Sequence, residues 1–179
     1  RDADGRLFVD AFLLTHPDQD HCAGLRRHFH LGPPDSWAKA DDKILVREMW
    51  SSPIVFRRAD RRTAAAGQTL CADAEAWRDE ARRRVRLFRA QGWLNDGDRI
   101  QIFGEDVDGK TDNLLPILVS AGSSFSTICG VTDGTFAGLL LAPMLADDDE
   151  EAEFLSKNNS SVIVRLTLAV DGNPTAGRF

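Results

Sequence analysis

Short apolar blocks separated by polar turns run along the chain and predict a series of strands. The blocks are rich in β-branched and aromatic residues, and glycine, proline or acidic residues bound them, as is typical of strands. The predicted strands are residues 8–14, 43–50, 99–103, 136–141 and 162–170. The run 8–14 is apolar enough to predict a buried strand, and residues 171–174 predict a turn before an antiparallel strand that Phe179 would open.

A different period appears in residues 71–91, which form the clearest predicted helix. Apolar residues recur there every three or four positions, the spacing that places side chains on one helix face. This buried stripe is Ala74, Trp77, Ala81, Val85 and Phe88. Gly92 is suited to end the helix. A shorter helix is predicted for residues 22–30, with Leu25 and Phe29 in contact. Strands and amphipathic helices together predict an α/β protein.

Arginines occupy the remaining faces of the long predicted helix. They are Arg78, Arg82, Arg83, Arg84, Arg86 and Arg89, and Arg57, Arg58, Arg61 and Arg62 come shortly before. Two interpretations stay open. Phosphate groups of a nucleic-acid substrate could be bound by Arg78, Arg82, Arg86 and Arg89. The alternative is a solvated face whose arginines pair with neighbouring acids, namely Asp73, Glu75, Asp79 and Glu80.

Composition limits the class of protein. The 179 residues suffice for a single domain, residues 1–179, with its own core, and 42% apolar with 28% charged residues is typical of a globular protein. The net charge of −6 argues against general coating of nucleic acid. No apolar run approaches the roughly 20 residues of a membrane span, and the three separate cysteines favour a reducing compartment, so a cytoplasmic protein is expected.

Candidate chemistry is concentrated immediately after the first predicted strand. His16, Asp18, Asp20 and His21 lie within six residues, and Pro17 forbids continued strand pairing there. Imidazole nitrogens and carboxylate oxygens suit zinc, iron or manganese. Four ligands at this spacing divide into His16 with Asp18 and Asp20 with His21, which implies two metal ions. The alternative is that these residues only form a turn at a loop tip.

The pattern His16-x-Asp18-x-Asp20-His21 resembles the signature loop of the metallo-β-lactamase superfamily, with aspartate in place of its middle histidine. It is similar to the branch that includes the soluble domain of DNA-uptake competence proteins, and Gly24 stands where that branch has a glycine. Residues 158–162 resemble the Asn-Asn-Ser-Ser segment of the same branch.

The resemblance implies an αββα sandwich with mixed sheets and two zinc ions, or manganese or iron. His16 and Asp18 would bind one ion, and His21 with Asp20 the other. Asp20 would also be catalytic, orienting a hydroxide between the ions that attacks an ester-type bond. The favoured substrate bond is a phosphodiester, in a small molecule or a nucleic acid.

The chain departs from the family pattern because the downstream aspartate and histidine segments are absent, as are the upstream strands. It begins at Arg1 and stops where a strand is predicted to begin, so we expect a fragment that is incomplete at both ends and that binds metal weakly and is inactive alone. A second interpretation is a non-catalytic scaffold domain that binds nucleic acid or protein and keeps a degenerate metal site. A third, a mononuclear structural zinc site, would favour cysteine ligands, and none is suitably spaced.

Overall fold

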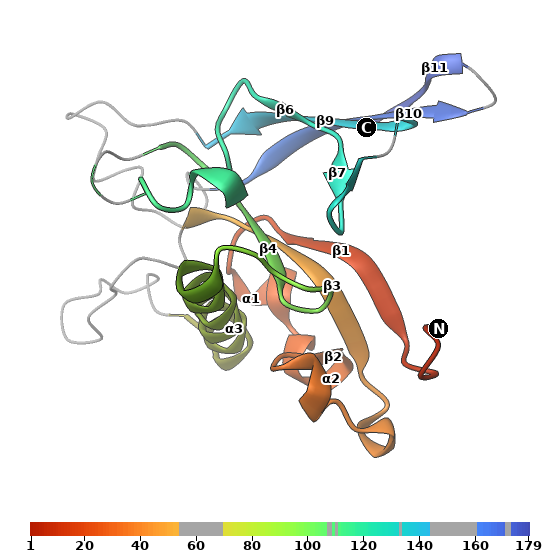
Figure 1. The fold of residues 1–179 in the computed structure, drawn as a ribbon, viewed down its shortest axis with the longest axis vertical. Helices are drawn as coiled ribbons and strands as arrows, with labels where there is room; N and C mark the ends of the chain where they lie inside the picture. The colour runs from red at the N-terminus through yellow and green to blue at the C-terminus, as the bar shows by residue number, and fades with distance from the viewer. Residues whose placement is uncertain (54–69, 107–108, 110, 133, 144–160, 171–172) are drawn as a thin grey trace.

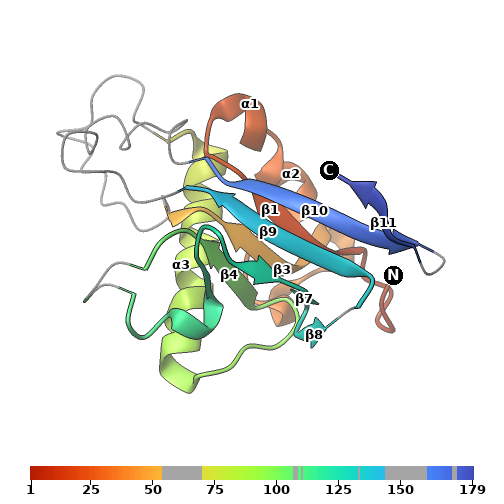
Figure 2. The ribbon, with the colours of Figure 1, turned by 90° about the horizontal axis from the view of Figure 1, so that it is seen from above.

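Three layers make up the computed structural model of the chain (Figure 1). It describes residues 1–53, 70–106, 109, 111–132, 134–143, 161–170 and 173–179. A parallel sheet forms the middle layer. One of its faces is covered by helices and the other by an antiparallel sheet, whose strands β9 and β10 cross above β1 and β3 (Figure 2). The chain is therefore a mixed α/β protein, as predicted.

The parallel sheet is built around β3 (Ile44–Ser51). On one side β3 pairs with β1 (Phe8–Leu14), and it also pairs with β4 (Arg99–Phe103) and β2 (Phe29–His30). β5 (Leu118–Val119) pairs with the far end of β4. Because β1 lies at an edge of this sheet, most of its side chains are half-buried, whereas the sequence predicted a buried strand.

The antiparallel sheet has the order β11, β10, β9 and β6. Their bounds are β6 (Ser124–Phe125), β9 (Phe136–Ala142), β10 (Ile163–Val170) and β11 (Asn173–Arg178). A separate hairpin joins β7 (Thr127–Ile128) to β8 (Val131–Thr132). Parallel and antiparallel pairing are thus separated into different sheets, not mixed within one. The last strand already spans Asn173–Arg178, so Phe179 follows that strand and does not open it.

The long helix α3 (Ala72–Gln91) covers the parallel sheet and confirms the predicted stripe. All five stripe residues are buried, and they pack against Val46, Met49 and Ile100 of the sheet. Gly92 ends the helix with a φ of 79°, a left-handed conformation that glycine adopts without strain. This layer is therefore held together mainly by burial of the apolar face of α3.

A second core of aromatic side chains lies between the two sheets. Trp50 and Phe103 from the parallel sheet meet Phe136 and Leu140 of β9. The ring centroids of Trp50 and Phe103 are 5.5 Å apart, a distance typical of favourable aromatic pairs. The outer face of the antiparallel sheet exposes Leu141 and is not covered by any helix among the described residues. The described part of the chain thus has three layers.

Arg84 corrects the prediction that the arginines of the helix all lie on its outer faces. Its side chain is completely buried, and it donates hydrogen bonds to Glu80 Oε1 and to the carbonyl oxygens of Arg99 and Val46, at 2.7, 2.8 and 3.0 Å. A guanidinium has five N–H donors, so one side chain can satisfy a carboxylate and two strands together. Arg84 therefore links α3 to β3 and β4.

The predicted helix over residues 22–30 is also wrong in extent. Two single-turn helices, α1 (Gln19–Cys22) and α2 (Leu25–His28), replace it, and the chain then enters β2. Gly24 between them has a φ of 93°, which interrupts the helix. The segment predicted as a loop at residues 120–126 contains β6. The predicted extended piece at 54–56, the arginines at 57–62, the acidic run at 147–153 and most of the Asn-Asn-Ser-Ser segment lie outside the described residues.

Candidate metal centre

The predicted metal residues follow the carboxyl end of β1. Leu14 at the end of β1 pairs with Ser51 at the end of its parallel neighbour β3, so two strand ends meet here. Ligand sites in α/β proteins commonly form at this edge of a parallel sheet. The backbone of the next residue, Thr15, accepts a hydrogen bond from Val162 N at 2.9 Å, just before β10. The loop is therefore attached to both sheets.

The single turn α1 positions the second half of the motif. The carbonyl oxygen of Asp18 accepts hydrogen bonds from the backbone N–H groups of His21 and Cys22, at 3.0 and 3.1 Å. Buried Pro17 precedes it and holds the chain extended before the turn. The chain consequently reverses between His16 and His21, which brings the side chains of these two residues together.

The two imidazoles lie next to each other, with ring centroids 3.9 Å apart and ring planes at 49°. Each has a carboxylate neighbour. His16 Nε2 is 3.8 Å from Asp18 Oδ2, and His21 Nε2 is 3.6 Å from Asp20 Oδ2. These are the two pairs that the sequence analysis named, although their roles as metal ligands stay predictions.

The four side chains of the motif differ widely in exposure. The side chain of His16 is 13% exposed and that of Asp20 is 80% exposed, with Asp18 and His21 between them. Thr15 Oγ1 lies 3.1 Å from His16 Nδ1, so a hydrogen bond there fixes the ring and leaves Nε2 beside Asp18. Metal-binding histidines are commonly oriented through their other ring nitrogen in this way. The arrangement suits metal binding in donor type. However, the described residues contain no group of three or more His, Cys, Asp or Glu that could hold an ion.

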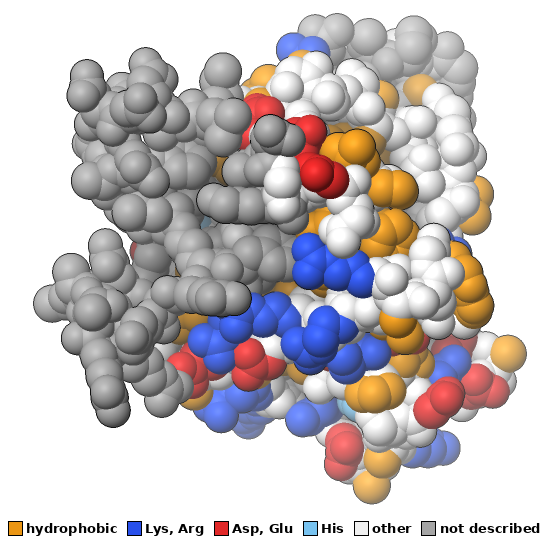
Figure 3. Space-filling view, turned by 60° about the vertical axis from the view of Figure 1, so that its left-hand side comes forward, with side chains coloured by type: hydrophobic (Ala, Val, Ile, Leu, Met, Phe, Trp, Pro, Cys, Tyr) orange, Lys and Arg blue, Asp and Glu red, His pale blue; other side chains and the backbone are white. Residues whose placement is uncertain are grey.

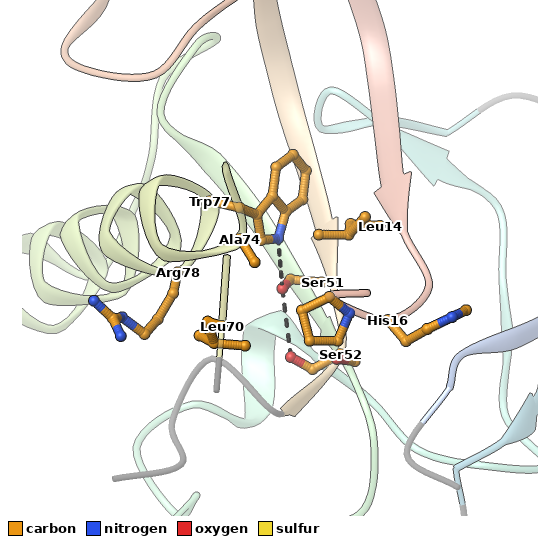
Figure 4. A pocket seen from close by; sticks show the side chains of 9 residues that line it. Leu14, His16, Ser51, Ser52, Leu70, Ala74, Trp77 and Arg78 are labelled. Atoms are coloured by element: carbon orange, nitrogen blue, oxygen red, sulfur yellow. Dashed lines mark hydrogen bonds between the residues drawn. The ribbon is translucent and has the colours of Figure 1, made fainter. Parts of the chain in front are cut away.

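Behind His16 lies a small apolar cavity of about 10 Å³, close to the space of one water molecule. Its walls include Leu14, Ala74 and Trp77, and the Trp77 indole donates a hydrogen bond to Ser51 Oγ at 3.1 Å. The imidazole of His16 points away from Trp77 and Ser51 (Figure 4). The His16 ring is therefore directed away from this cavity, towards His21.

The four arginines proposed for phosphate contacts differ in their surroundings. Arg78 lines the cavity behind His16 and forms an ion pair with Asp79 at 2.8 Å. Arg82 is half-buried, whereas Arg86 and Arg89 are exposed. Figure 3 shows one face of the molecule on which Lys and Arg side chains gather with Asp and Glu among them. The surface is thus mixed in charge, and of these four arginines Arg78 is the one that lines a cavity together with His16.

His30, a further candidate ligand, has a structural role. It is buried, and its Nε2 lies 3.0 Å from the carbonyl oxygen of Pro33 and 3.3 Å from Ser36 Oγ. His28 is exposed on the last turn of α2. The structure therefore brings together His16 and His21 and leaves the other two histidines apart from this pair.

Asp73 is an anchor of the site region that the sequence analysis did not identify. Its carboxylate accepts hydrogen bonds from the backbone N–H groups of Arg26 and Gly24, at 3.0 and 3.2 Å. The bond from the Arg26 backbone, followed by that from Gly24, lowers the pKa of Asp73 below its usual value. An acid in the first turn of a helix is a recognisable signal, but nothing in the sequence indicates this partner.

No helix in the described part of the chain is both long and apolar enough to cross a membrane. Comparisons of the chain with protein-family models, with curated proteins and with solved structures found no match.

Proposed function

We propose that the protein is a metal-dependent hydrolase of the metallo-β-lactamase type, acting on an ester-type bond and most readily on a phosphodiester. The observation that carries the proposal is the pairing of the His16 and His21 imidazoles, each beside a carboxylate, at the carboxyl end of parallel strands. The helix–sheet–sheet layering agrees with three of the four layers of the proposed αββα sandwich.

The proposed ligands are His16 with Asp18 for one ion and Asp20 with His21 for a second. Bound zinc, manganese or iron would supply Lewis acidity and lower the pKa of water from about 15.7 towards 7. Catalytic zinc normally has three protein ligands, whereas the proposed pairs supply two for each ion, and the described residues contain no group of three or more His, Cys, Asp or Glu that could hold an ion. We therefore expect this chain to bind divalent metal weakly.

The remaining roles follow from position. Thr15 orients the ring of His16, and Pro17 fixes the direction in which the loop leaves β1. Asp20 is the most exposed of the four side chains, so its carboxylate can accept a hydrogen bond from the attacking water and orient it. The phosphate contacts proposed for the substrate are Arg78, Arg82, Arg86 and Arg89 of α3, and of these Arg78 lines the cavity behind His16 with its side chain directed away from that imidazole (Figure 4).

Histidine NMR during titration with Mn²⁺ tests the site directly, because the chain supplies its own controls. The paramagnetic ion should broaden the ring signals of His16 and His21 at lower concentration than those of His28 and His30. Broadening of all four rings together, or of the exposed His28 first, would contradict the proposed site. Asp18→Asn should shift the broadening of His16 to higher Mn²⁺ concentration.

Hydrolysis of bis(p-nitrophenyl) phosphate tests the chemistry. In a form of the protein that shows metal-dependent turnover, Asp20→Ala should reduce kcat by about 10²-fold or more, as for loss of a positioned acid or base. Asp35→Ala removes an exposed carboxylate elsewhere and should leave kcat unchanged. Selective metal binding at His16 and His21 without turnover would instead support the scaffold interpretation.

A further inference from the structure

Two cysteine thiols meet beside the candidate metal centre. Cys22 Sγ and Cys71 Sγ are 3.3 Å apart, although the residues are 49 positions apart in the chain. Cys22 is the last residue of α1, directly after His21, and Cys71 is the N-cap residue of α3. Both are free thiols. A disulfide bond has an S–S length of about 2.05 Å, so the sulfur atoms need to approach by little more than 1 Å.

The two thiols differ in access to solvent. Cys22 is 1% exposed, and Cys71 is partly exposed. An oxidant dissolved in water therefore reaches Cys71 first, and Cys22 is positioned to react with the oxidised sulfur. This arrangement of an accessible thiol beside a second, resolving thiol is the usual one for reversible cysteine oxidation.

We propose that Cys22 and Cys71 form a reversible disulfide when the protein meets a peroxide. The sulfur of Cys71 attacks one oxygen of hydrogen peroxide, the O–O bond breaks, and the displaced hydroxide takes the Cys71 proton and leaves as water. The product is a sulfenic acid on Cys71. Cys22 then attacks that sulfur, the S–O bond breaks, and the second hydroxide takes the Cys22 proton and leaves as water. The two thiols are oxidised by two electrons, and the peroxide is reduced to two water molecules.

The crosslink would join α1, which carries Asp20 and His21, to the beginning of α3. The loop already has one attachment to this helix through Asp73, which is hydrogen-bonded to Gly24 and Arg26. A covalent bond would make the attachment permanent until reduction. Formation of this disulfide does not require a bound metal, since it needs only the two sulfur atoms at their observed positions.

Cys129 provides a matched control. It lies in the turn between β7 and β8 and is also buried. Its Sγ is 3.1 Å from the carbonyl oxygen of Asp10. Among the described contacts it has no cysteine neighbour. The same peroxide should therefore leave Cys129 as a thiol.

The experiment treats the folded protein with hydrogen peroxide, blocks remaining thiols with iodoacetamide and maps peptides by mass spectrometry. We expect loss of two thiols, a Cys22–Cys71 crosslinked peptide in the monomer, and recovery of both thiols with dithiothreitol. Cys71→Ser should abolish the crosslink, and Cys129→Ser should keep it. The melting temperature should rise on oxidation in wild type and in Cys129→Ser but not in Cys71→Ser, because a crosslink restricts the unfolded chain.

Three results would overturn the proposal. The first is oxidation of Cys71 to sulfinic or sulfonic acid while Cys22 remains alkylated. The second is a disulfide that includes Cys129 or joins two molecules. The third is an unchanged loss of two thiols in Cys71→Ser.

Discussion

Two clusters of ionisable side chains in this protein are built in opposite ways. Around Arg84, Glu80 and the guanidinium are both buried, and two strand carbonyls fix the arginine. Around His16 and His21, the imidazole–carboxylate distances are 3.6 to 3.8 Å and exposure reaches 80% at Asp20. The first cluster is complete without a ligand, whereas the second is open on one side. Closeness of ionisable side chains is thus not enough to identify a binding site. The His16–His21 cluster is a candidate site because solvent, and therefore a ligand, can reach it, whereas the Arg84 cluster is buried.

The largest effect is expected from breaking the buried cluster. Burial lowers the pKa of Arg84, opposed by attraction to Glu80, so the charge is stabilised mainly by its partners. Removing one partner of a buried ion pair typically costs about 3–5 kcal/mol. Arg84→Ala should therefore lower the free energy of unfolding by about that amount, measured by urea denaturation.

The control for this prediction lies two positions along the same helix. Arg86 is exposed, and Arg86→Ala should change the free energy of unfolding by no more than about 0.5 kcal/mol. The double variant Glu80→Leu with Arg84→Met should be more stable than Arg84→Ala, because it fills the space that alanine leaves empty and removes the buried carboxylate of Glu80, which in Arg84→Ala keeps only its ion pair with Arg83. Equal stability of Arg84→Ala and Arg86→Ala would refute the distinction between the two clusters.

An intermediate effect is expected at Glu48, a buried carboxylate that sequence analysis did not identify. It accepts hydrogen bonds from Trp50 Nε1 at 2.8 Å and from the backbone N–H of Cys129 at 2.6 Å. Glu48→Gln places an amide N–H₂ where an acceptor is needed, so it should cost about 1–3 kcal/mol. Denaturation at a series of pH values measures this cost.

The pH dependence has a definite sign. Burial raises the pKa of Glu48 above its ordinary value of 4.5, although the bonds from Trp50 and Cys129 oppose the shift. The folded state then binds more protons than the unfolded state, so this group's contribution to stability decreases as pH rises above about 4.5. The difference in free energy of unfolding between wild type and Glu48→Gln should therefore become smaller as the pH rises. A gap that widens instead would show that the folded-state pKa is not raised.

The smallest effect on stability is expected in the open cluster. The side chain of His21 is 47% exposed, so His21→Ala should change the free energy of unfolding by no more than about 0.5 kcal/mol. The same change should reduce any rise in melting temperature caused by Zn²⁺, since a ligand of the native state stabilises it. Calorimetry with and without Zn²⁺ measures both quantities. A large loss of stability without metal would mean that the pair is structural.

Much of the fold could be predicted because its signals are local. The buried stripe of α3 from Ala74 to Phe88 can be recognised because its apolar residues recur every three or four positions. The strands β3, β4, β9 and β10 can be recognised because each is a short apolar block. The two-residue strands carry too little pattern to be recognised. The sequence predicts a helix that includes Phe29 and His30, and their pairing with Ile44 and Leu45 depends on tertiary contacts that no local pattern reports.

The candidate site was predictable in position but not in detail. An apolar run followed by His16 and Pro17 shows where β1 ends. The contact between the two imidazoles depends on the single turn α1, which is too short to leave a periodic signal. The Glu80–Arg84 spacing was visible in the sequence. The same spacing occurs in solvated ion pairs. That this pair is buried could therefore be learned only from the structure, in which Arg84 donates hydrogen bonds to backbone carbonyl oxygens of β3 and β4.

The pairing within the parallel sheet has a kinetic consequence. Phe8 pairs with Leu45, and Glu48 pairs with Arg99, so each ladder joins residues that are distant along the chain. Such contacts require large loops to close before any pairing energy is gained, which slows folding. The hairpin of β10 and β11 pairs Val170 with Asn173 and can form early. Refolding should therefore begin at the antiparallel sheet, and the loop with His16 and His21 should take its final geometry among the last steps.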